Sequence, residues 1–463
     1  MNVRTRLASF LLLATLVLSG QGCFAPGVTA PPAASKPVTL TYWRVLDNGD
    51  AFDEIIRDYR ALHPNVTINY RKLRLEEYER ELVNALAEDR GPDIISLHNT
   101  WMRSYQSKLL PAPASVKLAF REVQGIQKNQ VWVEKTLPVI SPSQVKNQFV
   151  DQVGRDVVIK GPAADPKQGI VDQLWGLPLS IDTMALYYNK DVLNASGIPT
   201  PAQDWAEFQD HVKRMTKYDQ GKLVKPAAGI GTSRNVERSF DILSLLMMQN
   251  GAAMTDANGL PTFNRMPPNL DREITPAVEA LIFYTDYANP SKEVFTWDDA
   301  QPNSYDAFIS GKTGYFFGYA YHLPRIRAQA PKLNFGFTGI PQIDPAAKVN
   351  YANYWVESVS KKTANPDLAW DFVQFAAGAD RAKTYLAKTV KPTALRSLVN
   401  EQLNDPDLGV FASQVLTARS WYLGINVAAT EAAFNEMIDS TLQGAQPERA
   451  VNLAAQTVAQ TVR

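Results

Sequence analysis

The chain is poor in the residues from which many catalytic and metal centres are built. Among its 463 residues there is one cysteine, Cys23, so a disulfide within the chain is impossible. The four histidines stand far apart and show no metal-ligand spacing. The GxSxG, HExxH, P-loop and GxGxxG motifs are absent. We therefore expect no catalytic residue, no metal site and no cofactor.

An excess of charge of one sign is also missing. The 47 Lys and Arg residues balance the 47 Asp and Glu residues, and no dense basic run follows Arg6. This balance disfavours a nucleic-acid partner and a basic membrane-binding helix. The adjacent carboxylates of Asp298 and Asp299 could suggest a glycosidase. Neighbouring side chains rarely converge on one substrate atom, so we interpret this pair as a solvated turn.

The N-terminus has the pattern of a signal peptide. Arg4 and Arg6 precede an apolar run at 7–18, which is shorter than the ~20 residues that span a bilayer. The lone Cys23 follows this run and Gly22, and resembles the lipidated cysteine of bacterial lipoproteins. The sequence thus predicts a signal peptide at 1–22, lipidation of Cys23, and a flexible Pro- and Ala-rich tether at 23–36.

One position departs from the lipoprotein pattern. Gly20 stands where these proteins usually have Leu, three residues before the cysteine. The alternative is an ordinary secretory signal cut after Ala30, although Pro31 would hinder cleavage there.

The residues after the tether predict an α/β lobe. Alternating and helical patterns predict strands at 38–45, 66–70 and 94–97, with helices at 51–62 and 76–87 between them. Such a βαβαβ run implies a parallel sheet, and parallel sheets bind ligands beyond the carboxyl ends of their strands. The two loops at these ends hold our first candidate ligand contacts: Asp47, Asn48, Asp50, Asn99, Thr100 and Trp101. The alternatives are turn formation and helix capping for the first three, and a core or lobe-edge position for Trp101.

The rest of the chain predicts a second lobe and two crossings between the lobes. We expect strands at 175–178, 180–189 and 227–232, and helices at 205–215, 239–249, 275–289 and 366–387. Residues 111–173 are broken by prolines, and we interpret them as an insertion with some helix. No function can be assigned to that insertion.

The stretch 174–205, LWGLPLSIDTMALYYNKDVLNASGIPTPAQDW, resembles the crossover of bacterial extracellular solute-binding proteins of the sugar-binding type. These are the capturing subunits of ABC importers, and maltodextrin-binding proteins are their best-known branch. The resemblance runs from about Val38 to the C-terminus. It implies a two-lobed periplasmic-binding-protein-like fold, each lobe a mostly parallel sheet flanked by helices, joined by a hinge. It also implies an N-terminal lobe of 37–182 and 357–400, and a C-terminal lobe of 183–356 and 401–463.

The resemblance adds candidate ligand contacts to those from the loops. They are Asp182 in the first crossover, Tyr319 and Tyr321 after a strand of the second lobe, Trp355 in the return hinge, and Trp421. In the maltodextrin-binding relatives an acidic residue at the position of Asp182 contacts sugar hydroxyls, and charged groups stand at the positions of Thr100 and Trp101. Aromatic rings offer stacking area to the C–H faces of a sugar, and carboxylates and amides bind its hydroxyls. The alternative for Asp182 is capping of the hinge backbone.

These observations predict a monomeric binding protein rather than an enzyme. We expect it to capture a sugar or oligosaccharide in the cleft and to deliver it to ABC permease subunits. We further expect it to lie outside the cytoplasm, attached to the membrane through a lipid anchor. Two alternatives stay open: the same fold binding a sugar phosphate, polyamine or peptide, and a surface lipoprotein with an adhesive or hydrolytic role.

The lipid anchor can be tested directly. Cys23→Ala removes the thiol that would carry the lipid, so the protein should become soluble or persist as an uncleaved precursor. The tether separates this residue from the folded body, whose stability should not change. Detergent-phase partitioning measures the effect, and an unchanged partition would rule out the anchor.

Overall fold

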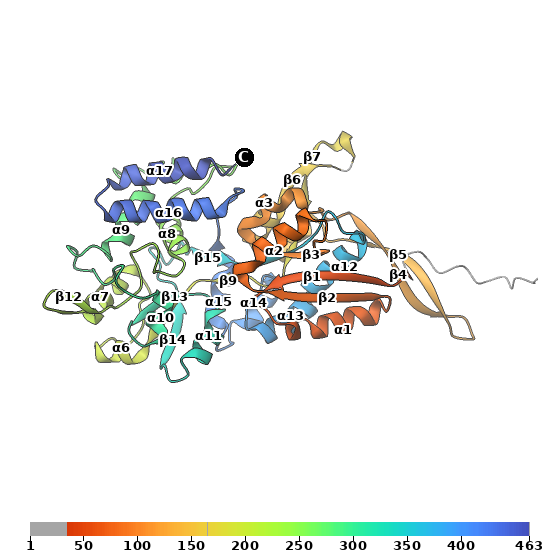
Figure 1. Ribbon diagram of the computed structural model, residues 1–463, viewed down its shortest axis with the longest axis horizontal. Helices are drawn as coiled ribbons and strands as arrows, with labels where there is room; N and C mark the ends of the chain where they lie inside the picture. Colours follow the sequence, from red (N-terminus) through yellow and green to blue (C-terminus); the bar gives the residue numbers. More distant parts are fainter. Residues whose placement is uncertain (1–34, 164, 463) are drawn as a thin grey trace, which may run out of the picture.

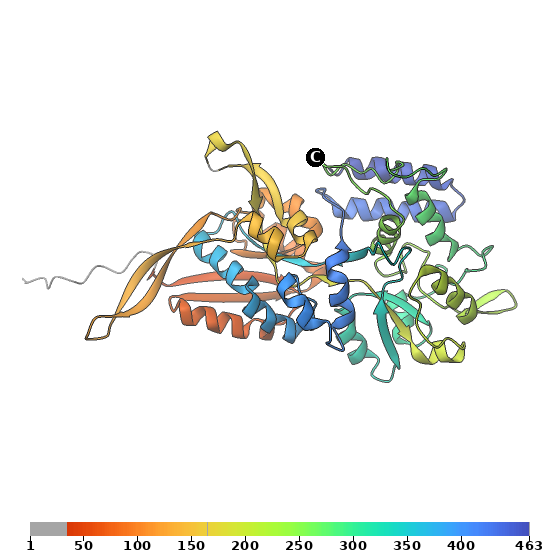
Figure 2. The ribbon, with the colours of Figure 1, turned by 180° about the vertical axis from the view of Figure 1, so that it is seen from behind.

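The computed structural model describes residues 35–163 and 165–462. The predicted signal peptide, Cys23 and all but the last two residues of the predicted tether lie outside this range. Within it the protein forms two lobes, N-terminal and C-terminal, lying side by side (Figures 1 and 2). The buried core of the N-terminal lobe consists of side chains from residues 40–181 and 352–418. The core of the C-terminal lobe consists of side chains from residues 184–351 and 411–458. The two-lobed α/β architecture is therefore confirmed.

The N-terminal lobe is built on a five-stranded sheet with the order β2-β1-β3-β16-β8. Strands β1 (Val38–Val45), β2 (Val66–Leu73) and β3 (Ile94–His98) are parallel. Strand β16 (Trp355–Val359) runs antiparallel to both β3 and β8 (Leu177–Pro178). In this register Trp355 faces His98, so the start of β16 lies beside the carboxyl end of β3.

Amphipathic helices cover this sheet. Helices α1 (Asp53–Leu62) and α2 (Leu75–Ala87) follow β1 and β2, and α1 turns Ile55 and Tyr59 into the core. The expected helix at 51–62 starts two residues later, because Gly49–Ala51 forms a 3-10 turn. The expected helix at 366–387 is two helices, α12 (Pro366–Ala377) and α13 (Ala379–Thr389), separated by Gly378 in an extended conformation.

The insertion at 111–173 is mainly two β-hairpins, so the expectation of some helix was incomplete. Hairpin β4 (Ser115–Gln124)–β5 (Asn129–Pro138) extends beyond the lobe in Figures 1 and 2, and β6 (Val158–Pro162)–β7 (Ile170–Leu174) forms the second. Gly125, at φ 75°, starts the turn of the first hairpin. The β-branched and aromatic residues in its two strands favour the extended conformation. Two short helices, α4 (Pro142–Gln148) and α5 (Asp151–Val157), lie between the hairpins.

The C-terminal lobe has a three-stranded sheet that corrects one expectation. Strand β10 (Ala185–Asn189) is antiparallel to both β13 (Tyr315–Gly318) and β14 (Phe335–Gly339), so the sheet is not mostly parallel. The cause is the path of the chain. Strand β10 enters the lobe from the hinge, whereas β13 and β14 lead back towards it.

Helices surround this small sheet and supply most of the second core. They are α6 (Lys190–Ala195), α7 (Trp205–Met215), α8 (Ser239–Gln249), α9 (Pro276–Asp286), α10 (Ser304–Ile309), α11 (His322–Gln329), α16 (Val427–Leu442) and α17 (Pro447–Ala459). A small hairpin, β11 (Lys217–Asp219)–β12 (Lys222–Lys225), follows α7. Helices α14 (Arg396–Gln402) and α15 (Gly409–Gln414) connect α13 to the third crossing between the lobes.

The expected strand at 227–232 was wrong. Only one bridge forms there, between Ala228 and Tyr315. Gly231 has a φ of 109°, which breaks an extended strand. A Cβ atom at Gly229 would lie 2.4 Å from the Cβ atom of Ser304, so the chain passes too close to α10 to carry side chains there.

The lobes are joined by a second three-stranded sheet, which we call the hinge sheet. Its strands are β9 (Asp182–Thr183), β15 (Asn350–Asn353) and β17 (Ala418–Arg419), in the order β17-β15-β9. Each strand is one passage of the chain between the lobes. The expected strand at 180–189 is consequently split into β9, which pairs in the hinge sheet, and β10, which pairs inside the C-terminal lobe.

Asp182 fastens the hinge sheet to the C-terminal lobe. One carboxylate oxygen accepts the backbone N–H groups of Thr183 at 2.8 Å and Ala320 at 2.9 Å, and the other accepts that of Tyr321 at 3.2 Å. Burial raises the pKa of Asp182 to about 7, although these three backbone donors and Lys391 oppose the rise.

A buried cluster of charged side chains connects β1 with β16 and with α13. The Arg44 guanidinium contacts the carboxylates of Glu357 and Asp47, and it donates to Tyr385 Oη at 2.7 Å. Asp47 accepts from Tyr385 at 2.7 Å and from Lys391 Nζ at 2.6 Å. Burial alone would raise the pKa of Asp47, but Arg44 and Lys391 lower it to about 2. All four charges are therefore paired, as buried ions must be.

Removing one partner should cost stability. In Glu357→Gln the Arg44 guanidinium loses a buried carboxylate, and Tyr42 and Ser96 lose a charged acceptor. We expect the free energy of unfolding to fall by about 2–4 kcal/mol, as measured by urea denaturation. Lys213→Gln, which breaks an exposed pair with Glu293, is the control and should leave the midpoint unchanged. Equal effects of the two substitutions would contradict the account.

The pKa of Asp182 predicts a pH effect with a definite sign. A folded-state pKa of about 7 lies above the ordinary value of 3.8, so the fold favours the protonated carboxyl. This contribution is complete below pH ~4 and is lost as the pH rises through ~7. Asp182→Asn keeps the group neutral, so relative to wild type it should be more stable at pH 8 than at pH 5, by about 1–3 kcal/mol.

Thermal denaturation of both proteins at pH 5, 6, 7 and 8 measures this difference. Any constant cost of the Asn side chain cancels, because the prediction concerns only its change with pH. A stability difference that stays flat across this range would refute it.

Candidate functional site

The carboxyl end of β3 places aromatic rings at the edge of the N-terminal lobe. Trp101 lies 5.6 Å from Trp355, edge to face, and stacks on Tyr105 at 6.0 Å and more loosely on Tyr78 at 6.5 Å. Trp101 and Trp355 pack against the core but keep part of their surface exposed. This pair can therefore offer stacking area to a ligand beside the hinge.

His98 sits within this aromatic group. Its Nδ1 lies 2.7 Å from the Thr100 hydroxyl, and its Nε2 lies 3.1 Å from Asn353 Oδ1 in the hinge sheet. Burial, together with the charge of Arg238 in the C-terminal lobe, lowers the pKa of His98 to about 4. The ring is thus neutral near pH 7, and a cation of the opposite lobe acts on it.

The C-terminal lobe contributes a second polar and aromatic wall. Tyr319 and Tyr321 stack at 5.8 Å, with 15° between the rings, and the Tyr319 hydroxyl donates to Asp241 at 2.6 Å. Arg238, at the start of α8, donates to both oxygens of Asp241 at 2.7 and 2.9 Å. Tyr319 and Asp241 are fully buried, while Tyr321 is partly exposed and is the ring of the two that a ligand can reach.

The residues predicted from the first loop lie elsewhere. Asp47 belongs to the buried charge cluster, so a ligand hydroxyl would have to displace one of its donors. Asn48 accepts from Lys72 at 2.7 Å, and the backbone oxygen of Asp50 accepts from Lys388 at 3.0 Å. Their role as ligand contacts stays a prediction.

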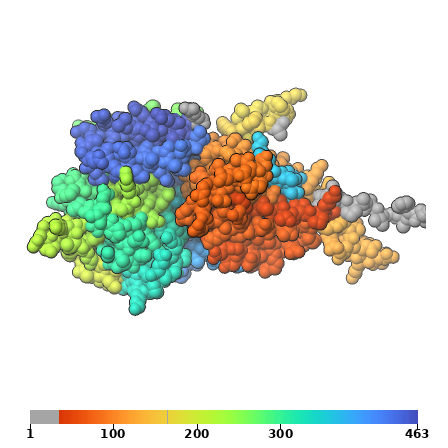
Figure 3. All heavy atoms as spheres, in the orientation of Figure 1, coloured from red at the N-terminus to blue at the C-terminus, as the bar shows by residue number. Residues whose placement is uncertain are grey.

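A pocket of about 570 Å³ opens between the lobes, which meet across the middle of the molecule (Figure 3). Helix α5 supplies Gln152, Arg155 and Asp156 to one side of the pocket, and the segment 252–257 after α8 lines the other. The third crossing passes along the pocket and adds Arg419, Ser420 and Trp421.

Two predicted residues lie at this pocket. Trp421 lines it, although most of the ring is buried against Phe240 and Phe434, and its Nε1–H donates to Ser244 at 3.0 Å. Asn99 lies beneath it and donates to Ser420 at 2.9 Å and to Asp156 at 3.2 Å.

Asp156 is the centre of a buried polar network under the pocket. Besides Asn99, it accepts from Tyr354 at 2.6 Å, from Gln152 at 2.8 Å and from Ser420 at 3.2 Å. Burial raises the pKa of Asp156 to about 6, although these four donors oppose the rise. The network joins the N-terminal lobe to the third crossing, so it links the pocket to the hinge.

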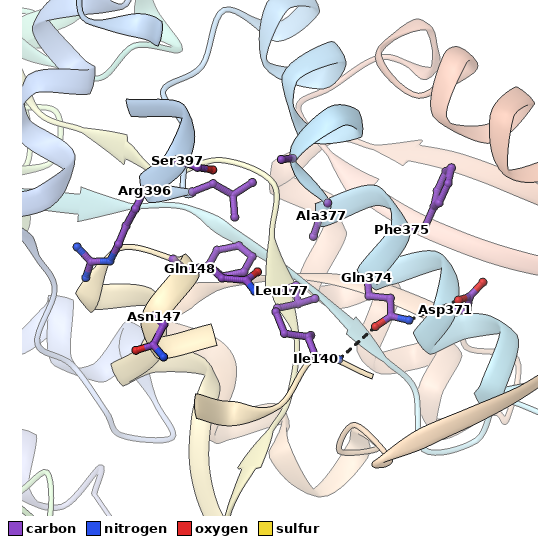
Figure 4. Close-up of a pocket in the computed structure, with 14 residues that line it drawn as sticks. Ile140, Asn147, Gln148, Leu177, Asp371, Gln374, Phe375, Ala377, Arg396 and Ser397 are labelled. Atoms are coloured by element: carbon purple, nitrogen blue, oxygen red, sulfur yellow. Dashed lines mark hydrogen bonds between the residues drawn. The ribbon is translucent and has the colours of Figure 1, made fainter. Parts of the chain in front are cut away.

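A second pocket, of about 620 Å³, lies within the N-terminal lobe between α4, α12 and the start of α14 (Figure 4). Its walls include Phe149, Leu177 and Phe375, and Gln374 accepts from the backbone N–H of Ile140 at 3.2 Å. A molecule bound there would touch one lobe, so it could not hold the two lobes together.

Sequence reasoning missed several residues of the interlobe pocket. Gln152, Arg155 and Asp156 fall in the insertion, where no motif marks them. Arg419 and Ser420 directly precede Trp421, so their position beside a predicted contact was an available signal. Outside this pocket, Arg238 and Asp241 were also missed, because they lie at the start of a helix whose inward face looked purely apolar.

Within 35–163 and 165–462, no three His, Cys, Asp or Glu side chains are arranged to hold a metal ion. Across those same residues, no helix is both long enough and apolar enough to cross a bilayer.

Asp298, the first residue of the adjacent carboxylate pair, lies in a turn. One of its carboxylate oxygens accepts from the backbone N–H of Ala300 at 3.1 Å and from the Gln301 side chain at 3.2 Å.

Known proteins resemble this chain in sequence. The galactooligosaccharide-binding protein of Bacillus subtilis (strain 168) is 20% identical over 408 residues, which cover 87% of this chain and 83% of that protein. The maltodextrin-binding protein MdxE of the same strain is 25% identical over 284 residues, covering 58% of each chain.

The fold has solved counterparts. A cyclic α-maltosyl-1,6-maltose binding protein from Arthrobacter globiformis superposes with a TM-score of 0.70 at 18% identity, covering 92% of this chain and 99% of that one. The sugar-binding protein MalE from Xanthomonas citri gives a TM-score of 0.66 at 16% identity, covering 92% and 97%. Residues 43–383 also match the sequence profile described as bacterial extracellular solute-binding protein. The chain therefore belongs to the bacterial extracellular solute-binding protein family.

Proposed function

We propose that this protein captures an oligosaccharide between its lobes and delivers it to the permease subunits of an ABC importer. The observation that carries the proposal is the pair Trp101 and Trp355, partly exposed at the hinge edge of one lobe, with Tyr321 on the other. Stacking rings beside polar groups suit the alternating C–H faces and hydroxyl rims of sugars. The names of the relatives, which include galactooligosaccharide and maltodextrin binders, support the same class of ligand.

The proposed mechanism is closure about the hinge sheet, without a chemical step. The moving bodies follow the expected division, residues 37–182 with 357–400 and residues 183–356 with 401–463, except that β16 begins at Trp355, so 355–356 move with the N-terminal lobe. A ligand that touches both lobes binds the closed state more tightly than the open state, and so shifts the population towards closure. We further propose that the protein acts as a monomer, held at the outer face of the membrane by a lipid on Cys23.

Asp182 has a structural role in this proposal. Its carboxylate oxygens already accept three backbone N–H groups, so hinge capping explains its position better than direct contact with a sugar does. Ligand affinity then depends on Asp182 through the geometry of the hinge.

A thermal-shift screen tests the function. Maltotriose, mannotriose, galactotriose, spermidine, glucose 6-phosphate and a tripeptide would each be added to the purified protein. A rise in melting temperature with an oligosaccharide, without its breakdown, supports the proposal. A rise with spermidine, the phosphate or the peptide alone would contradict it.

The aromatic pair yields the sharpest mutational prediction. Trp101→Ala and Trp355→Ala each remove one stacking face, so the affinity for the sugar that binds should fall about 10- to 100-fold. Binding should also change the tryptophan fluorescence of the wild type. Calorimetry measures the affinities. Tyr218→Ala, on the exposed hairpin of the C-terminal lobe, is the control and should bind normally. Wild-type affinity in both tryptophan variants would exclude the pair from the site.

A further inference from the structure

The interlobe pocket has two arginines whose hydrogen-bonding capacity is almost unused. Arg155 projects from α5 and Arg419 from the hinge sheet, and both line the pocket. Among the described residues, neither forms an ion pair with a carboxylate, and the one hydrogen bond found for the two goes from Arg419 to the backbone oxygen of Ala418 at 3.3 Å. Two guanidinium groups carry ten N–H donors, so most of these point to solvent or to the pocket.

The charge of Arg155 also acts on Arg419. Burial lowers the pKa of Arg419, and the charge of Arg155 lowers it further, while Asp151 opposes this effect. Asp151 is itself paired with Arg396. A like charge beside the partly buried Arg419 makes its charged form less favourable, and an anion placed between the two guanidinium groups would relieve this cost.

Three of the four carboxylate oxygens that line the pocket, those of Asp156 and Asp256, are already occupied. Both oxygens of Asp156 accept hydrogen bonds from neutral side chains in the buried polar network under the pocket. One oxygen of Asp256 accepts the backbone N–H groups of Asn258 at 2.8 Å and Leu260 at 2.9 Å, within a turn. The unused capacity of the pocket is therefore dominated by cationic donors.

One buried acceptor completes the pattern. Gln152 is 2% exposed and lines the pocket, and its Oε1 atom has no hydrogen-bond partner within the described residues. A buried amide oxygen without a partner costs free energy, which a ligand hydroxyl at this point would recover. A ligand with one hydroxyl group and one anionic group would therefore supply partners for Gln152 and for the two arginines.

We propose that the pocket binds an acidic oligosaccharide, with Arg155 and Arg419 holding its anionic group and Gln152 accepting a neighbouring hydroxyl. The anionic group is the carboxylate of a uronic acid or the sulfate of a sulfated sugar, since planar guanidinium groups recognise both. This inference rests on the proposed function and narrows it from oligosaccharides to charged ones. Closure places Arg155 of one lobe and the segment 252–257 of the other around the same group.

Calorimetry with a defined panel tests the inference. The acidic probes are trigalacturonate, trimannuronate, triguluronate and a sulfated neocarratetraose, and the neutral probes are maltotriose, mannotriose and galactotriose. At least one acidic probe should bind at least about 10-fold more tightly than every neutral one, and its affinity should fall as salt rises. Whether the best probe is a uronate or the sulfated sugar identifies the anionic group. For a uronate, the methyl ester removes the charge at constant linkage and should lose the advantage.

Substitutions locate the binding group. Arg155→Gln and Arg419→Gln should each weaken binding of the best acidic probe by about 10-fold or more, and should weaken it by a larger factor than binding of any neutral sugar. Arg57→Gln, an exposed arginine on α1, is the matched control and should have no effect. If a neutral probe binds as tightly as the best acidic probe, the inference is wrong and the proposed function stays intact. Acidic binding that survives both substitutions would overturn the inference as well, and failure of both series to bind would overturn the inference and the function together.

Discussion

The architecture depends on the hinge sheet, where three passages of the chain pair side by side. Strands β9, β15 and β17 leave one core and enter the other, so the lobes share no continuous hydrophobic core and are joined by backbone hydrogen bonds. Asp182 adds two further bonds, accepted from the backbone N–H groups of Ala320 and Tyr321, that attach this sheet to the segment directly after β13. A short hydrogen-bonded hinge between two separately packed bodies allows them to rotate without unfolding.

The hinge also explains where the candidate ligand groups lie. Strand β3 ends at His98 beside the start of β16, and β13 ends beside Asp182, so both sheets direct their ends towards the crossings. Trp101 and Trp355 come from one lobe, Tyr321 from the other, and Arg419 from the hinge sheet itself. A ligand that contacts these groups must also contact the elements that move.

The sequence predicted the fold well because its signals are local and periodic. The βαβαβ start of the N-terminal lobe follows from alternating and helical patterns, and the structure differs there only at element ends, as in the 3-10 turn at Gly49–Ala51. The sequence did not predict the features that depend on how distant segments of the chain meet. The antiparallel direction of β10 and the close passage at Gly229 depend on contacts with distant segments. The pocket residues of α5 were missed for the same reason, because only folding brings Arg155 beside Arg419.

The central claim is that the lobes close around a bound oligosaccharide. Small-angle X-ray scattering of the purified protein, alone and with a saturating amount of the panel oligosaccharide that binds most tightly, tests it most directly. The account predicts a smaller radius of gyration with the sugar, since closure brings the centres of the two lobes together. An unchanged radius of gyration, with binding demonstrated by calorimetry in the same sample, would contradict the account.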